Sequence, residues 1–195
     1  MDQDEIRILK MLEALSENPA QTQRDLSKKL KISLGLVNSF TKRLTKKGYF
    51  KITTIPKNRM RYALTAKGLS EKANLTYRYI LYSIEYYKDT RAKFKSLFSR
   101  LSKLNKKKIY FFGVSELAEI AYMTLQETDL CLAGIIDEEQ AGSTFMGVTI
   151  KGISGLKKLS ADDIVVITKI NEFHDIENLM SRYGITEENV LLPSG

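Results

Sequence analysis

Gly113, Ser115 and Ala118 follow an apolar run and open a helical pattern, at the spacing of the G-x-G-x-x-G turn that holds a pyrophosphate. The first glycine allows a tight turn, and alanine at the third position still lets a helix pack against the preceding strand. Ser115 replaces the glycine that lets a pyrophosphate approach the backbone, so the spacing does not favour a standard NAD site. We expect this turn to bind a nucleotide-containing ligand without transforming it, and an empty turn is the alternative.

Short strands and helices must position this turn. Five runs are typical of strands, namely KIYFFG, LCLAGIID, GVTIKG, DIVVIT and NVLLP, and helical patterns lie between several of them, in SELAEIAYMTLQE, GLKKL and FHDIENLMSRYG. The alternation predicts a doubly wound parallel sheet of about five strands. Ligands of such sheets bind beyond the carboxyl ends of the strands, where the strand order reverses.

Three predicted loops meet at that edge, after the first, second and fourth strands. Asp137 lies 24 residues after Gly113, close to where an acidic residue would hold a ribose hydroxyl. Lys169 would meet a phosphate there. Solvated surface is the common alternative for acidic and basic loop residues, and it stays open for both. The candidate ligand-binding residues are Gly113, Ser115, Glu116, Asp137, Glu138, Thr168 and Lys169.

The charge of the chain is divided unevenly. Residues 1–108 carry 26 Lys and Arg against 9 Asp and Glu, whereas residues 109–195 carry 5 against 14. A basic segment favours a polyanion because cations that neutralise phosphates release counterions, and an acidic segment is repelled by the same partner. The first half is therefore predicted to bind nucleic acid, and the second half is predicted to have a different function.

The basic half begins with a pattern typical of a helix-turn-helix. Apolar residues recur at helical spacing from Ile6, a break follows at Pro19, and Thr22 and Ser33 are suited to cap two short helices. On the second short helix one side is apolar, and the other carries small polar residues followed by cations, which suits a helix entering the major groove. Its predicted DNA-facing residues are Ser33, Gly35, Ser39, Lys42, Arg43 and Lys46.

Two β-prone runs, YFKITTI and RMRYAL, follow Gly48 and are joined by PKN, which predicts a hairpin. Such a wing would touch phosphates or the minor groove through Lys57, Asn58, Arg59 and Arg61. Roughly residues 6–104 resemble the MarR-like winged-helix regulators in the order of the segments SxxLVNSFTKRLTKKGYFK, RMRYAL and TAKG. More narrowly, they resemble the members of that family associated with exopolysaccharide operons. The resemblance implies a dimer that binds duplex DNA.

Residues 68–104 contain no proline, and no glycine after Gly68, so they predict one long helix. Large apolar residues recur in steps of four and three, from Ala73 onward, with one polar interruption at Arg91, which is a heptad seam that would pair with a second copy. A stacking surface for single-stranded nucleic acid or a membrane-surface helix is the alternative. The predicted dimerisation residues are Tyr77, Ile80, Ile84, Tyr87, Phe94, Phe98 and Leu101.

The acidic half resembles the small Rossmann-like domain of sugar-amine acetyltransferases and the related CoA-binding-like domain of polysaccharide proteins. The segments YFFGVSELAEIAY, LAGIIDEE, MGVTIKGISGL and DIVVIT carry the resemblance, over roughly residues 108–168. It implies that Gly113, Ser115, Asp137 and Glu138 hold the nucleotide of a UDP-sugar. No left-handed β-helix repeats follow, so the catalytic part of those enzymes is missing.

Catalysis, metal binding and membrane insertion are not expected. One cysteine, Cys131, and one histidine, His174, leave no metal or Cys/His nucleophile cluster, and no signal peptide or membrane span is predicted, so we expect a cytoplasmic protein. The prediction is an α+β winged helix-turn-helix (1–68), a long dimerisation helix (69–105), and an α/β Rossmann-like domain with a parallel sheet (106–195) that senses a nucleotide sugar, NAD or CoA. The alternatives for that last domain are an inert dimerisation or partner-binding module and a nucleotide-sugar enzyme.

Overall fold

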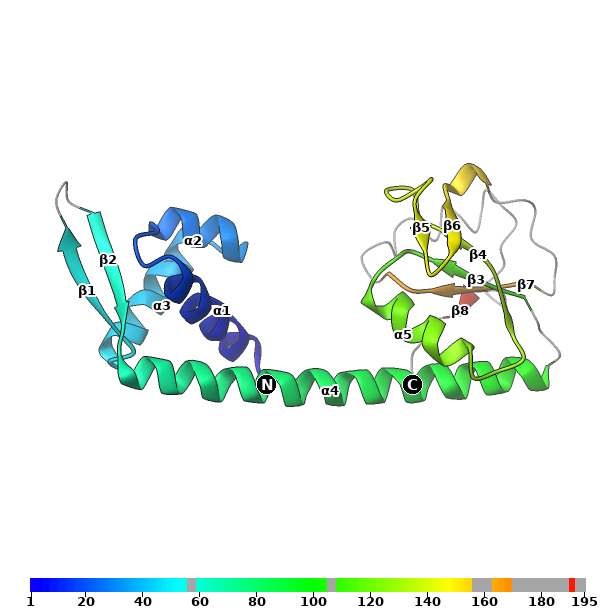
Figure 1. Cartoon of the computed structure of the whole chain (residues 1–195), viewed down its shortest axis with the longest axis horizontal. Coiled ribbons are helices and arrows are strands. Elements are labelled where there is room, and N and C mark those ends of the chain that lie inside the picture. Colours follow the sequence, from blue (N-terminus) through cyan, green and yellow to red (C-terminus); the bar gives the residue numbers. More distant parts are fainter. Residues whose placement is uncertain (56–58, 105–107, 156–162, 170–189, 192–195) are drawn as a thin grey trace. The chain divides into compact units, whose positions relative to one another are not determined.

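The computed structural model describes residues 1–55, 59–104, 108–155, 163–169 and 190–191. These residues form two compact units, Met1–Glu85 and Tyr86–Gly195, and one long helix contributes to both (Figure 1). The boundary therefore falls inside a helix that the sequence assigned to a segment of its own.

The first unit begins with three helices, α1 (Gln3–Glu17), α2 (Gln23–Leu30) and α3 (Leu34–Lys46). The predicted caps are confirmed, because the Thr22 side chain accepts from the backbone of Asp25 in a capping box, and Ser33 accepts from the amide of Leu36. The apolar faces of the helices meet in one core, which includes Met11, Leu12, Leu15, Leu26, Val37, Phe40 and Leu44.

The predicted hairpin is also confirmed. Strands β1 (Phe50–Ile55) and β2 (Arg59–Leu64) pair antiparallel, with Ile55 opposite Arg59. The turn that joins them, including Lys57 and Asn58, lies outside the described residues. The amide of Tyr62 in β2 donates to the Pro19 carbonyl at 2.8 Å, which ties the hairpin to the connection between α1 and α2.

Helix α4 (Ala66–Lys103) is continuous, as the sequence predicted. Thr65 precedes it and its hydroxyl donates to the carbonyls of Gly48 and Tyr49, at 2.6 and 3.1 Å. Leu75 belongs to the core of the first unit, whereas Phe94, Leu97, Phe98 and Leu101 belong to the core of the second.

The second unit contains a mixed sheet with the strand order β5-β6-β4-β3-β7-β8. The pairs β4–β6, β3–β4, β3–β7 and β7–β8 are parallel, and β5–β6 is antiparallel. The sequence predicted the parallel strands but not β5, which is two residues long. The strands are β3 (Lys108–Phe112), β4 (Cys131–Ile136), β5 (Thr144–Phe145), β6 (Val148–Lys151), β7 (Asp163–Ile167) and β8 (Val190–Leu191).

Helix α5 (Glu116–Leu125) connects β3 to β4, and a 3-10 turn, η1 (Ile153–Gly155), follows β6. The end of α4 and one side of α5 share a core with alternate residues of the sheet, such as Ile109, Phe111 and Ile135. Two further predicted helices lie almost wholly outside the described residues, namely GLKKL and FHDIENLMSRYG. His174 belongs to the second of them and also lies outside.

Candidate nucleic-acid interface and glycine turn

Helix α3 presents a polar face to solvent. Gly35, Ser39, Lys42 and Lys46 are exposed, while Val37, Phe40, Thr41 and Leu44 are buried on the other side. Asn38 is exposed within the same stripe and was not among the predicted residues, although the helical period of 3.6 places it there. A side-chain amide can bond an adenine edge in two places, so Asn38 is a further candidate for contact with a base.

Arg43 differs from its neighbours because another helix engages it. Its Nη2 lies 3.2 Å from Asp4 Oδ2 of α1, and its guanidinium stacks 4.6 Å from the centre of the Phe40 ring. The pair is solvent-exposed, so its contribution to stability is small. A phosphate would nevertheless have to compete with Asp4, which makes Arg43 a weaker candidate than Lys42.

The wing contributes one described cation of the predicted set. Arg61 is exposed on β2 opposite Thr53, whose hydroxyl donates to the Arg61 carbonyl at 3.4 Å. Arg59 is the first residue of β2, but the placement of its side chain lies outside the described structure. Lys57 and Asn58 stay predictions.

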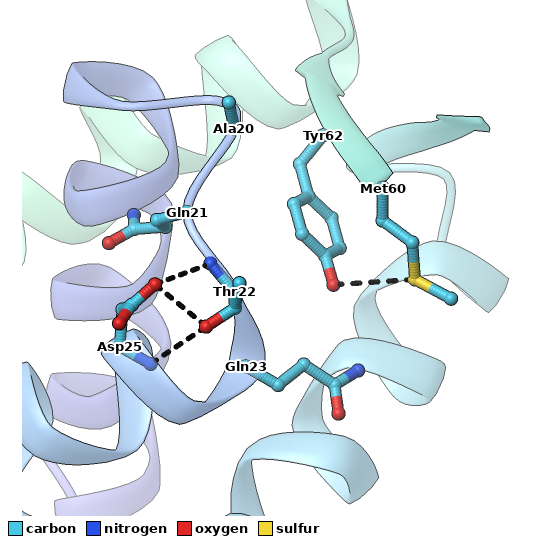
Figure 2. Close-up of a pocket in the computed structure, with 7 residues that line it drawn as sticks. All are labelled: Ala20, Gln21, Thr22, Gln23, Asp25, Met60 and Tyr62. Atoms are coloured by element: carbon cyan, nitrogen blue, oxygen red, sulfur yellow. Dashed lines mark hydrogen bonds between the residues drawn. The ribbon is translucent and has the colours of Figure 1, made fainter. Parts of the chain in front are cut away.

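A cavity of about 460 Å³ lies between the first turn of α2 and strand β2 (Figure 2). Four of the side chains drawn around it bond in pairs, because Asp25 accepts from the amide and hydroxyl of Thr22 and the Tyr62 hydroxyl points to the sulfur of Met60. The amide nitrogen of Gln21 has no partner among the described residues, but it is itself buried from solvent. The lining thus offers a ligand few free polar groups. The lining residues are Ala20, Gln21, Thr22, Gln23, Asp25, Met60 and Tyr62.

In the second unit Ser115 closes the glycine turn. Its hydroxyl donates to the Thr168 carbonyl, and its oxygen caps α5 by accepting from the amide of Leu117 at 3.1 Å. Thr168 is buried, and its hydroxyl bonds the carbonyls of Phe112 and Gly113. Both side chains therefore hold the ends of β3 and β7 together, and neither needs a ligand to satisfy it.

Asp137, proposed to hold a ribose hydroxyl, is fully buried and bonded by the backbone. One carboxylate oxygen accepts from the amide of Val114 at 2.9 Å, and the other from the amides of Glu139 and Gln140 at 3.0 and 3.2 Å. Both carboxylate oxygens therefore have hydrogen-bond donors within the protein. Asp137 is placed to fix the glycine turn against the loop after β4.

The aliphatic part of Lys169 covers the glycine turn. Gly113 has a φ of 89°, and a β-carbon there would lie 2.2 Å from Lys169 Cβ. The Lys169 ammonium lies 2.8 Å from Glu139 and 3.5 Å from Asp137. Glu138 accepts from the amide of Ile153 at 2.8 Å, and Glu116 lies in the first turn of α5. A pyrophosphate approaching the backbone at Gly113 would have to move the Lys169 side chain.

The structure divides the predicted dimerisation residues into two groups. Tyr77, Ile80, Ile84 and Tyr87 expose between 39% and 63% of their surface, whereas Phe94, Phe98 and Leu101 expose at most 3%. The second group packs against the sheet of its own unit, so it is not available to a second copy without disrupting that core. The sequence could not distinguish the two because burial by a partner and burial by a sheet require the same apolar spacing.

None of the helices in the described part of the chain combines the length and apolarity that a membrane span requires. Within the same residues no group of three or more His, Cys, Asp or Glu side chains is arranged to hold a metal ion.

Residues 4–51 match the family model described as "Winged helix-turn-helix DNA-binding". The segment contains α1, α2, α3 and the start of β1, which is the part of the chain that presents the polar face of α3. A search of curated proteins finds no match to this chain.

Among solved structures, the S. aureus MepR–DNA complex is similar at 18% identity and a TM-score of 0.39, over 45% of this chain and 63% of that one. The PcaV transcriptional regulator from Streptomyces coelicolor, bound to its natural ligand, is similar at 20% identity and a TM-score of 0.40, over 53% and 75%. A MarR family transcription regulator is similar at 17% identity and a TM-score of 0.40, over 63% and 66%. By the family model alone, residues 4–51 are similar to winged helix-turn-helix DNA-binding domains.

Proposed function

We propose that the chain is a transcription regulator of the MarR type that binds duplex DNA as a homodimer. The exposed face of α3 carries this proposal, because it places small polar residues, Asn38 and two lysines on one side of a helix in a DNA-binding domain. Its N-terminal part would read base edges in the major groove, and Arg59 and Arg61 of the wing would contact the backbone or the minor groove beside it.

Binding to a promoter fragment, measured by fluorescence anisotropy at several salt concentrations, tests the DNA contacts. Lys42→Ala should weaken binding by about tenfold and lower the slope of log K against log salt by about 1, because one phosphate or base contact is lost. Arg59→Ala should act in the same direction. Lys151→Ala removes an exposed lysine of β6 and is the matched control. Unchanged affinity in both test variants would exclude this mode of binding.

The homodimer is supported by the first group of seam residues, which leaves four large apolar side chains of α4 exposed. Exposed apolar surface of this extent is characteristic of an interaction site. Light scattering on the full chain tests the dimer, and Ile84→Lys should shift it to the monomer because two lysines would enter an apolar contact. A chain truncated after Leu104 is not suitable for this measurement, because removal of the second unit would expose Phe94 and Phe98 to solvent.

A second proposal concerns the acidic unit, which would sense a nucleotide sugar, NAD or CoA. The strand order supports it, because the parallel strands run outward in both directions from β3 and the order reverses there, beside Gly113. The proposal places the ligand beside Gly113 and Glu116, where it would have to displace the Lys169 side chain from the turn and from its ion pairs with Glu139 and Asp137. The proposal assigns no catalytic residue.

Calorimetry with UDP-sugars, NAD(H) and CoA tests this sensor, and operator binding with and without the ligand tests its effect on DNA affinity. If the acidic unit is an inert module, none of these ligands should give a binding heat or change the affinity of the protein for its operator. Turnover in the same mixtures would instead indicate a nucleotide-sugar enzyme. The link to polysaccharide genes is part of the same proposal, and mapping the bound promoters in the genome tests it.

A further inference from the structure

Leu34 begins helix α3 but does not join the core beneath it. It is the first residue of the helix, 44% of its surface is exposed, and it belongs to neither of the two apolar cores. The next apolar residues of the same helix, by contrast, include the buried Val37 and Phe40. A leucine left in water at this end of α3 would gain free energy by contact with an apolar group of a partner.

Asn38 lies one turn further along the same side of α3. Residues four apart on a helix are neighbours, with β-carbons about 5–6 Å apart, so the side chains of Leu34 and Asn38 lie next to one another. Asn38 is exposed, and among the described residues no group bonds its side-chain amide. Arg43, in contrast, is already paired with Asp4. The first turns of α3 therefore offer an apolar group and an unengaged amide side by side.

Gly35 lies between these two residues and leaves space in front of the helix backbone. A β-carbon there would meet no other part of the protein within 4 Å, and the residue does not adopt a left-handed conformation. Neither packing nor backbone geometry within the unit therefore requires a glycine, although glycine weakens a helix relative to alanine. The space fits a partner that approaches the backbone closely, as the floor of a DNA groove does.

We infer that Leu34 and Asn38 read a thymine and an adenine at one base-pair step of the operator. An asparagine amide bonds adenine N6 and N7 together, and an apolar side chain contacts the 5-methyl group that distinguishes thymine. The two residues are about 6 Å apart along the helix axis, and base pairs stack about 3.4 Å apart, so both side chains reach the edges of two adjacent pairs. The inference rests on the proposed binding of duplex DNA and adds the bases that are read.

Lys42 and Lys46 continue the same face of α3 and indicate a polyanion as the partner. Both lysines are exposed, and they follow Asn38 at helical spacing. A partner protein would also cover Leu34, but two exposed cations on the same face favour DNA, whose phosphates flank the base edges. Phosphate contacts carry no sequence information, so discrimination between sequences at this end of the helix falls to Leu34 and Asn38.

Base analogues in the operator test the two contacts. Selection of random duplexes by the full-length chain first gives the preferred site. Each thymine of that site is then replaced by uracil, which lacks only the 5-methyl group, and each adenine by 7-deazaadenine, which lacks the N7 acceptor. One uracil should weaken binding about three- to fourfold, as expected for one buried methyl group, and 7-deazaadenine at the same step about two- to tenfold, as expected for one hydrogen bond.

Protein variants assign each response to a residue. Leu34→Ala should lose the response to uracil and keep the response to 7-deazaadenine, and Asn38→Ala should do the reverse. Both residues are exposed, so the fold should tolerate the changes, which circular dichroism checks. Lys42→Ala is the matched control, because it should weaken binding to every site and keep both responses.

The inference is overturned by a site at which no uracil weakens binding, or at which the loss persists in Leu34→Ala. The same holds for 7-deazaadenine and Asn38→Ala. A chain that binds duplex DNA without selecting any sequence would also exclude base reading by these residues. A Leu34→Ala protein that associates less with itself in the absence of DNA would assign Leu34 to a protein contact instead. A chain that binds no duplex at all would refute the proposed function, so the two failures are distinguishable.

Discussion

Replacement of Gly68 by alanine should unfold the first unit far more easily. A β-carbon at this position would lie 1.9 Å from the Tyr49 carbonyl oxygen and 2.7 Å from its carbon. Both are backbone atoms, so no side-chain rotation can relieve the overlap, and α4 would have to move away from the start of β1. That movement strains the bonds of Thr65 to Gly48 and Tyr49.

The expected cost is about 3 kcal/mol. Overpacking alone costs about 1–3 kcal/mol, and each weakened hydrogen bond adds about 1 kcal/mol. Alanine returns about 1 kcal/mol of helix propensity, which is too little to offset these terms. For a unit of this size the melting temperature would fall by roughly 12–24 °C.

Gly35→Ala is the matched control, because it makes the same change in another helix where no atom lies within 4 Å of the new methyl group. It should stabilise the unit by about 0.5–1 kcal/mol. Urea denaturation of both full-length variants, followed by circular dichroism, measures the difference, which should be about 4 kcal/mol. A Gly68→Ala protein within 1 kcal/mol of Gly35→Ala would refute the reasoning from the close approach to Tyr49. The control variant also tests the DNA face, since its methyl group would stand where a base edge is expected.

Three further substitutions test the local hydrogen bonds. The Thr22 hydroxyl and amide lower the pKa of Asp25, so Thr22→Ala should raise that pKa toward its ordinary value in a carbon-13 NMR titration; the stabilisation by the cap is present above the ordinary pKa and is lost as the pH falls through the lowered one. Ser115→Gly restores the pyrophosphate-turn glycine but removes the hydroxyl that caps α5 and donates to the Thr168 carbonyl, so it should lower stability by about 1 kcal/mol, mostly through the lost hydrogen bond, measured by urea denaturation. Asp137→Ala leaves three backbone amides without their acceptor and should cost about 3 kcal/mol or more in the same assay; a cost below 1 kcal/mol would contradict the role of the buried carboxylate.

The sequence predicted the elements of the first unit well because their signals are local. Thr22 and Ser33 cap helices within three residues of themselves, and Gly48, with a φ of 76°, follows α3 where a left-handed residue is needed. The polar face of α3 follows from periodicity alone. The ion pair of Arg43 with Asp4 joins residues 39 positions apart, and no local pattern contains that information.

The sequence predicted which loops meet at this edge of the sheet, but not how their side chains are hydrogen-bonded. Loop spacing brought Gly113, Ser115, Asp137 and Thr168 to one edge of the sheet, and the hydrogen bonds among these loops confirm that they meet. Spacing does not say where a carboxylate points, and the Asp137 side chain turned inward to the backbone. The contact of Lys169 with Gly113 also depends on the sheet register, which is visible only once β3 and β7 are paired.

Arg91 marks the position where one heptad pattern divides into an exposed part and a buried part. In the sequence Arg91 is the single polar residue of the seam. In the structure its guanidinium pairs with Glu127, just after α5, and this pair raises the pKa of Arg91 further. C-terminal to this residue the seam positions Phe94, Phe98 and Leu101 belong to the core of the second unit, and N-terminal to it they are exposed. A charged side chain would be costly inside the core of the second unit, so it is tolerated where that core ends.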